Sequence, residues 1–299
     1  MLDQAKRLRE LMRQRIPTGS NTPHQQGDEF SALVIAVASG KGGVGKSNFS
    51  TNLAMQLRKA GKRVTIIDAD FGLANVEILM GLHPKSNVLD VLNGKSDMLS
   101  ALTEGPLGCK LLSGGAGISS LTDAELTDGQ LLRLIEGFAQ LNSIADCIII
   151  DTRAGLSNSV LNFIKAASET IVVTTPDPTA IADAYALIKS VKSTMPDCEQ
   201  LKLVVNNTVT KQEGTEVYDK LNGVCKRFLG VRMVLLGCIP YDPHLVKAVR
   251  RQQPVSLLYP HSESAQRFVE IASKLLEVDV QKTSSIQNFV LKLIGRFGA

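Results

Sequence analysis

A glycine-rich stretch at residues 39–47, SGKGGVGKS, carries residue types that bind phosphate. Gly40, Gly45, Lys46 and Ser47 match G-x-x-x-x-G-K-[ST] after an apolar run and before a helical pattern. Glycines let backbone N–H groups turn toward phosphate oxygens, and a following helix adds the positive end of its dipole. We expect Lys46 to reach the β- and γ-phosphates and Ser47 to bind Mg²⁺. A glycine-rich turn without a ligand is the alternative, which the complete motif in this position disfavours.

The whole loop is therefore assigned to binding of a nucleoside triphosphate. Its candidate contact residues are Gly40, Gly42, Gly43, Val44, Gly45, Lys46, Ser47 and Asn48.

Three aspartates follow apolar runs and complete the predicted chemistry. Asp151 ends CIIID and is placed to hold Mg²⁺ through water. Asp68 and Asp70 lie two apart in IIDADFGLAN, and carboxylates at i and i+2 leaving a strand can point at one ligand. One would orient a water for attack on the γ-phosphate, and the other would tune the metal. Two such acids in isolation indicate an ordinary loop, but beside the glycine-rich motif the catalytic interpretation is favoured.

The elements that must position these groups alternate between apolar runs and helical patterns. Predicted strands cover 33–39, 63–68, 109–113, 146–151, 170–175, 201–206 and 234–239, and predicted helices cover 46–60, 123–141, 157–168, 179–195, 213–228 and 262–277. The strand runs are apolar throughout, which is typical of strands covered on both faces. We therefore predict an α/β domain over residues 31–277, with a mostly parallel central sheet of about seven or eight strands and helices on both faces.

Composition limits the function classes. The 299 residues are 44% hydrophobic and 21% charged, as in a soluble globular protein. A net charge of +4 does not suggest a general nucleic-acid binder. The five cysteines include no C-x-x-C pair, so zinc and iron–sulfur sites have no support, and their scatter fits a reducing cytosol. The first residues lack the apolar core of a signal peptide, and no run approaches the ~18 apolar residues of a membrane span.

The two ends differ from the body. Residues 1–16 have helical apolar spacing with five basic and two acidic side chains, and 17–30 is a polar linker rich in turn formers. Residues 278–299 combine a polar linker with a basic amphipathic helix, which suits an anionic membrane surface. Its apolar face comprises Ile286, Phe289, Val290, Leu293, Ile294 and Phe297. Docking of that face on the protein's own domain is the alternative.

Four segments together resemble the deviant Walker-A ATPases of the MinD/ParA group. They are SGKGGVGKS, DADFGLANVEILMGL, IIIDTRAGLSNSVL and TTPDPTAIADAYALIK, and the likeness runs through most of 33–277. The resemblance implies ATP and Mg²⁺ as cofactors and a homodimer that forms when ATP binds. It implies that Lys41, the first lysine of the loop, crosses to the partner subunit's phosphates.

The resemblance also assigns further roles. Asp70 would activate water, Asp68 and Asp151 would lie in the Mg²⁺ region, and Asp183 would contact Lys41 when ATP is absent. The base would be held by two loops, with contact residues Asn206, Asn207, Pro240, Tyr241 and Asp242. It favours membrane targeting for the C-terminal helix, hence a cytoplasmic protein that associates reversibly with the inner face of the cell membrane.

One residue departs from the family pattern. Members usually carry a small residue or proline after the acid–Thr/Ser pair, whereas this chain has Arg153 in DTRAG. The guanidinium could contact phosphate, crowd the neighbouring loop and slow hydrolysis, or point to solvent. The sequence leaves these three open, and we class Arg153 with Asp183 as regulatory.

The N-terminal segment DQAKRLRELM resembles a motif of the flagellar-number regulators of this group. That implies an activator helix for an FlhF-type GTPase, with contacts through Gln4, Leu8 and Arg9, and a second set of partners among flagellar switch (C-ring) proteins. A simple solvated helix is the alternative. Two other functions stay open: a septum-site or chromosome-partition ATPase of the same group, and a nucleotide-gated scaffold with negligible hydrolysis.

Overall fold

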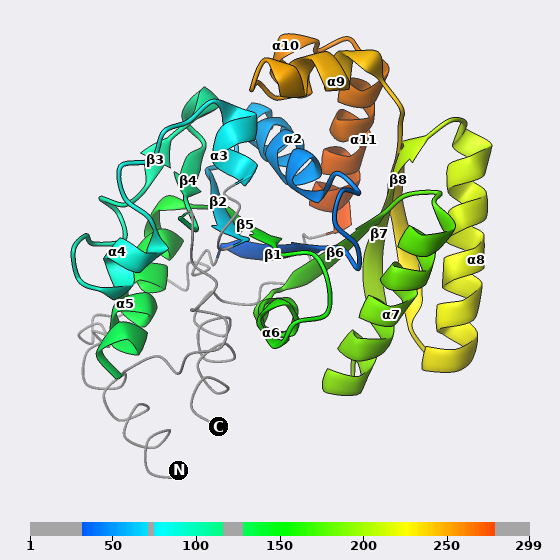
Figure 1. Cartoon of the computed structure of the whole chain (residues 1–299), viewed down its shortest axis with the longest axis horizontal. Coiled ribbons are helices and arrows are strands. Elements are labelled where there is room, and N and C mark those ends of the chain that lie inside the picture. Colours follow the sequence, from blue (N-terminus) through cyan, green and yellow to red (C-terminus); the bar gives the residue numbers. More distant parts are fainter. Residues whose placement is uncertain (1–31, 71–74, 116–127, 279–299) are drawn as a thin grey trace, which may run out of the picture.

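The computed structural model describes residues 32–70, 75–115 and 128–278. They build one eight-stranded sheet in the order β3-β4-β2-β5-β1-β6-β7-β8 (Figure 1). Every pair is parallel except β3 with β4. The strands are β1 (Leu33–Ala38), β2 (Val64–Ala69), β3 (Thr103–Glu104), β4 (Lys110–Leu112), β5 (Cys147–Thr152), β6 (Glu169–Thr174), β7 (Gln200–Thr208) and β8 (Arg232–Pro240). The predicted fold class is confirmed.

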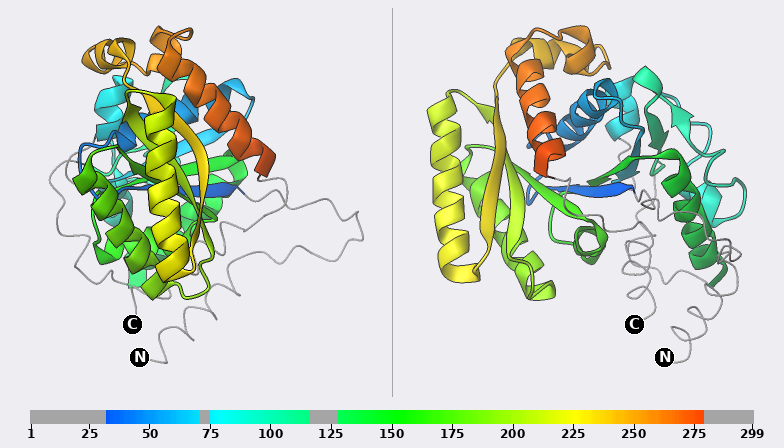
Figure 2. Two further views of the ribbon diagram at one scale, coloured as in Figure 1. Left: turned by 90° about the vertical axis from the view of Figure 1, so that its right-hand side faces the viewer. Right: turned by 180° about the vertical axis from the view of Figure 1, so that it is seen from behind.

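Helices cover both faces of this sheet (Figures 1 and 2). One face carries α2 (Lys46–Lys59), α3 (Asn75–Met80), α9 (Pro243–Arg250), α10 (Val255–Leu258) and α11 (Glu263–Val278). The other carries α4 (Val88–Leu92), α5 (Asp128–Ile144), α6 (Asn158–Ala166), α7 (Pro178–Thr194) and α8 (Lys211–Leu229). A 3₁₀ turn, η1 (Pro106–Gly108), connects β3 to β4.

The two-sided cover explains the continuous apolar runs. In β1, Ile35 and Val37 pack into the core beneath α2 and α11, while Val34 and Ala36 pack into the cores on the opposite face. All four are fully buried. A strand with solvent on one face would alternate instead.

The order of the strands determines at which edge of the sheet the candidate site residues meet. The chain leaves β1 toward β2 on one side, and β6 lies on the other side of β1. Such a switch point leaves a crevice beyond the carboxyl ends of the central strands. The glycine-rich loop follows β1, Asp68 and Asp151 face each other in register on β2 and β5, and Asp177 follows β6. Residues far apart in the sequence thus meet at one edge.

Predictions for the two ends fall outside the described residues. These are the 1–16 helix with Gln4, Leu8 and Arg9, the 17–30 linker, and all of the 278–299 tail beyond Val278, including the six apolar residues named above. Within the parts that are described, no helix combines the length and apolar character needed to cross a membrane.

Candidate functional site

The glycine-rich loop is shaped to bind an anion. Gly43 and Gly45 have φ values of 82° and 88°, a backbone conformation that other residues rarely adopt. Gly45 is the N-cap of α2 and supplies no side-chain hydrogen bond. The first N–H groups of α2 therefore remain available for phosphate, as predicted from the motif.

Packing fixes the same loop from two sides. A Cβ on Gly40 would lie 2.1 Å from the carbonyl oxygen of Asp183, and a Cβ on Gly45 would lie 2.3 Å from Nδ2 of Asn206. That Nδ2 donates to the carbonyl of Val44 at 2.8 Å. Asn206 thus braces the phosphate loop directly, whereas the sequence suggested only contact with the base.

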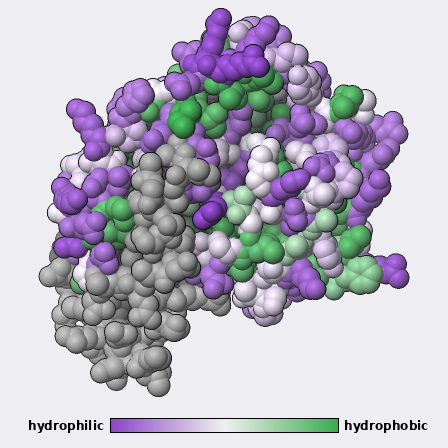
Figure 3. Space-filling model, in the orientation of Figure 1, coloured by the Kyte–Doolittle hydropathy of each residue, from purple (hydrophilic) through white to green (hydrophobic). Residues whose placement is uncertain are grey.

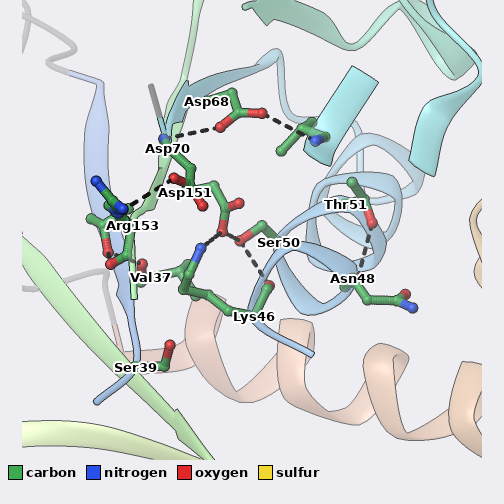
Figure 4. A network of polar contacts seen from close by, with 12 residues as sticks. Val37, Ser39, Lys46, Asn48, Ser50, Thr51, Asp68, Asp70, Asp151 and Arg153 are labelled. Carbon is green, nitrogen blue, oxygen red and sulfur yellow. Dashed lines mark hydrogen bonds and ion pairs between the residues drawn. The ribbon is translucent and has the colours of Figure 1, made fainter. Parts of the chain in front are cut away.

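Lys46 and Asp151 form the buried centre of the site (Figure 4). Lys46 Nζ lies 2.9 Å from Asp151 Oδ1, with the two side chains 7% and 0% exposed. Ser50 Oγ donates to the same carboxylate oxygen at 2.8 Å. The other oxygen, Oδ2, is buried and has no hydrogen-bond partner within the described residues. An oxygen left in that condition fits a water or ion of a magnesium site, which is the chemistry predicted for Asp151.

Asp68 lies beside this centre and is held by backbone groups. Its Oδ1 accepts from the N–H of Asp70 and its Oδ2 from the N–H of Val76, both at 3.1 Å. Burial, with a further contribution from the charge of Asp151, raises the pKa of Asp68 to about 7. A bound divalent cation would oppose that rise, so Asp68 also fits the predicted metal region.

Asp70 and Arg153 face each other at the rim of the site. Arg153 Nε lies 4.0 Å from Asp70 Oδ1, and the side chains are 54% and 10% exposed. Burial raises the pKa of Asp70, while Lys46 and Arg153 oppose that shift. Arg153 is therefore directed at the predicted water-activating carboxylate (Figure 4). Of the three alternatives that the sequence left open for Arg153, a side chain that points only to solvent does not fit this geometry.

Lys41 requires a correction. Its Nζ lies 3.1 Å from Asp177 Oδ2 and also hydrogen-bonds Thr179, whereas Asp183 was predicted to hold it. Asp177 caps the N-terminus of α7, so its carboxylate lies at the strand-to-helix turn beside the loop. Asp183 lies more than one turn further along the helix, and its backbone carbonyl approaches the loop at Gly40.

The two loops predicted to hold the base meet at one place. Asn207 has φ of 59° at a register shift in β7, and the N–H of Tyr241 donates to the carbonyl of Thr208 next to it. Tyr241 is 59% exposed. Pro240 ends β8. Base contacts for these residues remain a prediction.

Asp242 was also assigned to the base, and its carboxylate is used otherwise. Oδ1 accepts from the N–H of His244, and Oδ2 accepts from the N–H and Oγ of Ser264. Burial opposes ionisation, but the bonds from Ser264 and His244 outweigh it and lower the pKa of Asp242 to about 2. With both oxygens occupied by α9 and α11, the side chain is a structural cap.

Sequence reasoning missed Ser50, Asn52 and Asp177. Asn52 is completely buried, donates from Nδ2 to Oδ1 of Asn48 at 2.7 Å, and accepts at Oδ1 from the N–H of Ser256 at 2.9 Å. An asparagine on the buried face of an amphipathic helix was the available signal, because such a group needs partners. Asp177 had the signal Asp-Pro, a cap followed by proline at the first helical position.

The arrangement can bind a triphosphate and a divalent cation. The loop N–H groups and Lys46 would hold phosphate, and Ser47, Asp68 and Asp151 would surround the cation, which when bound withdraws charge from the phosphates. Asp70 lies at the rim, where its carboxylate could hold a water beside the guanidinium of Arg153.

Comparison with known proteins agrees with this geometry. Residues 31–276 match the family model ParA, described as an NUBPL iron-transfer P-loop NTPase. The chain is 39% identical to the antiactivator FleN of Pseudomonas aeruginosa over 84% of this chain and 89% of that protein. It is 34% identical to the flagellum site-determining protein YlxH of Helicobacter pylori over 99% of this chain and 100% of that protein.

Among solved structures, the MinC:MinD cell division complex of Aquifex aeolicus is similar in fold. The TM-score is 0.66 at 26% sequence identity, covering 85% of this chain and all of the matched chain.

Proposed function

Since this chain belongs to the MinD/ParA family of P-loop ATPases, in the group that includes FleN and YlxH, we propose that it is a switch that dimerises on binding ATP and resets by slow hydrolysis. The contrast between its two loop lysines supports this. Lys46 is buried against Asp151 in its own site, whereas Lys41 is 40% exposed at the surface. Lys41 can leave Asp177 and reach the phosphates of a second copy.

We assign hydrolysis to groups of the phosphate loop and of the strand ends beside it. Lys46 binds phosphate oxygens of the ATP in its own subunit, and Lys41 binds those of the ATP in the partner subunit. Asp70 orients the attacking water. Ser47, Asp68 and Asp151 hold the Mg²⁺ region, and Asn206, Asn207, Pro240 and Tyr241 lie toward the base. In this proposal Arg153 regulates the rate through Asp70.

The biological output that we propose is control of flagellar number or placement. The names of the two relatives support it: one is an antiactivator and the other a flagellum site-determining protein. The 1–16 helix would act on an FlhF-type GTPase through Gln4, Leu8 and Arg9, and flagellar switch proteins would be further partners. The ATPase would be cytoplasmic, and the 278–299 tail would place the dimer on the inner face of the cell membrane.

Substituting Asp70→Ala tests the catalytic assignment. The variant should bind ATP and dimerise in gel filtration, yet release phosphate at least ~100-fold more slowly than the wild type. Lys41→Ala is its counterpart and should bind ATP but remain a monomer. Normal turnover by Asp70→Ala would remove Asp70 from the mechanism, and an ATP-dependent dimer of Lys41→Ala would remove Lys41 from the interface.

A septum-site function is the second candidate, favoured by the likeness to the MinC:MinD complex. Deleting residues 1–20 separates the two. Under the flagellar proposal the truncated protein no longer stimulates an FlhF-type GTPase and still hydrolyses ATP. No stimulation by the full chain would favour the septum-site alternative, and unchanged stimulation by the truncated protein would remove Gln4, Leu8 and Arg9 from the contact.

A further inference from the structure

Helices α3 and α9 present a mixed apolar and basic surface that the nucleotide chemistry does not use. Ile78 on α3 is 50% exposed and Val249 on α9 is 37% exposed. Their ends meet, because a Cβ on Gly81 would lie 3.0 Å from the carbonyl oxygen of Gln252. Figure 3 shows apolar surface in this region with hydrophilic side chains above it. We call this surface the α3–α9 face.

The exposed charged side chains of α9 and its C-cap are all basic. Lys247, Arg250 and Arg251 are all exposed on α9 or its C-cap. Within the described residues none of the three forms a salt bridge. The nearest acid of α3, Glu77, already accepts a hydrogen bond from Ser113 at 2.7 Å. An apolar centre beside unpaired cations is complementary to a surface that combines apolar and acidic side chains.

Both halves of the face are tied to the nucleotide site. On one side, the N–H of Val76 in the first turn of α3 donates to Asp68. On the other, α10 follows α9, and the N–H of Ser256 donates to Asn52. Asn52 in turn donates to the carbonyl oxygen of Asn48 at 2.9 Å and to its side chain. A shift of α9 and α10 would therefore reach the residue after Ser47 through one buried side chain.

We propose that the α3–α9 face binds an acidic amphipathic helix of a partner protein, and that Asn52 transmits this binding to the nucleotide site. Helix recognition of this kind uses apolar anchors at i, i+3, i+4 and i+7 with charged residues beside them. The docking step is independent of the proposed ATPase function; the transmission step rests on the proposed nucleotide site.

A membrane surface is the less suitable occupant. Membrane-binding helices insert bulky apolar side chains from one continuous face. Here Leu245 of α9 and Leu82 after α3 pack against the core, which leaves Ile78 and Val249 on two different elements. Ile78 and Val249 are too few and too small to anchor a protein in lipid, but they can pack against the apolar side chains of a single partner helix.

The probe is a fluorescent 14-residue peptide with leucines at helical spacing and glutamates elsewhere, and its twin carries lysines instead. Anisotropy is measured with the full chain, first without nucleotide. The acidic peptide should bind and the basic twin should not. The double variant Arg250→Glu/Arg251→Glu and the single variant Ile78→Asp should each weaken binding by roughly tenfold or more. Equal binding of the two peptides would overturn the proposal.

Matched controls lie on α8, where the same changes should leave peptide affinity unaltered. Lys226→Glu/Arg227→Glu repeats the charge change, and Val224→Asp replaces a side chain that is 40% exposed. A similar loss in these controls would show that net charge or stability, not the face, governs binding. Sedimentation with vesicles of phosphatidylcholine and phosphatidylglycerol is the second arm. Vesicle binding that Arg250→Glu/Arg251→Glu abolishes, without peptide binding, would assign the face to lipid.

Transmission is measured as the change in affinity for fluorescent ADP when the acidic peptide is present. Asn52→Ala should keep peptide binding and lose that change. Should Asn52→Ala not fold, Lys59→Met removes the 2.7 Å bond to the Ser256 carbonyl from the other end of α2 and should reduce the change. Peptide binding with an unaltered ADP response in the wild type would refute transmission. Failure to bind ADP at all would refute the nucleotide site instead.

Discussion

At the scale of single residues, ion pairs within the subunit determine where the cationic side chains of the site lie when no nucleotide is bound. The described residues bring Lys41 to Asp177, Lys46 to Asp151 and Arg153 toward Asp70. Each cation that we assign to the reaction is thus beside a carboxylate of its own subunit. Binding of a triphosphate must compete with these pairs, because phosphate oxygens and carboxylates accept from the same donors.

Asp177 and Asp183 can be separated by one substitution each. Asp177→Asn keeps the helix cap but weakens the hold on Lys41, so ATP-dependent dimerisation should rise modestly, on the order of twofold, as expected for a surface pair. Asp183→Asn should leave the dimer fraction unchanged. Gel filtration or light scattering with ATP measures both. A rise with Asp183→Asn alone would restore the original assignment.

Arg153→Gly is expected to change the pH dependence of hydrolysis. Burial raises the pKa of Asp70 and the guanidinium opposes that rise, so its loss leaves the pKa of Asp70 higher. The acid limb of the kcat/KM profile should therefore move to higher pH in Arg153→Gly. Arg153→Lys retains a charge and should lie between the two. Profiles that coincide for all three proteins would mean that Arg153 does not act on Asp70.

At the scale of elements, short connections hold the site together. Asp242 caps α9 and accepts from Ser264 near the N-terminus of α11, so one carboxylate joins two helices. Asn52 joins α2 to α10 in the same way. Neither group need touch a ligand to matter for binding.

Asp242→Asn tests the capping role through stability. The pKa of this carboxyl is lowered to about 2, below its unfolded value, so it stabilises the fold above about pH 4. We expect the variant to lose about 2 kcal/mol of unfolding free energy at pH 7, by the usual conversion of pKa shifts. The difference from wild type should shrink as the pH falls from 4 toward 2. Denaturant titrations at several pH values measure it, and a constant difference would contradict the assignment.

Long elements were predictable, whereas among the short ones only the three-residue β4 was, from the strand predicted at 109–113. The strand predicted at 146–151 became Cys147–Thr152 and the helix at 179–195 became Pro178–Thr194, because both carry long apolar patterns. The four-residue α10, the five-residue α4 and the two-residue β3 are too short for a period to register. Helix α9 was missed although Asp242-Pro243 repeats the Asp-Pro start of α7.

In the candidate site, too, some residues could be predicted from the sequence and others could not. Lys46 follows the loop after β1, and Asp68 and Asp151 lie near the ends of β2 and β5, so the sequence could place all three at one edge, because parallel strands end together. The partner of Lys41 could not be derived, since it depends on which turn of α7 faces the loop. The role of Asn206 was likewise missed, because its contact with Val44 spans 162 positions.

At the scale of the whole molecule, the proposal predicts that ATP controls membrane residence. One amphipathic tail binds lipid weakly, whereas a dimer presents two and gains avidity, on the order of 100-fold. Vesicle sedimentation of the full chain should therefore rise sharply with ATP over ADP. Lys41→Ala should sediment weakly with either nucleotide, and deletion of 279–299 should abolish sedimentation while leaving the ATP-dependent dimer intact. Strong ATP-dependent sedimentation by Lys41→Ala would separate membrane binding from dimerisation and require another route from nucleotide to tail.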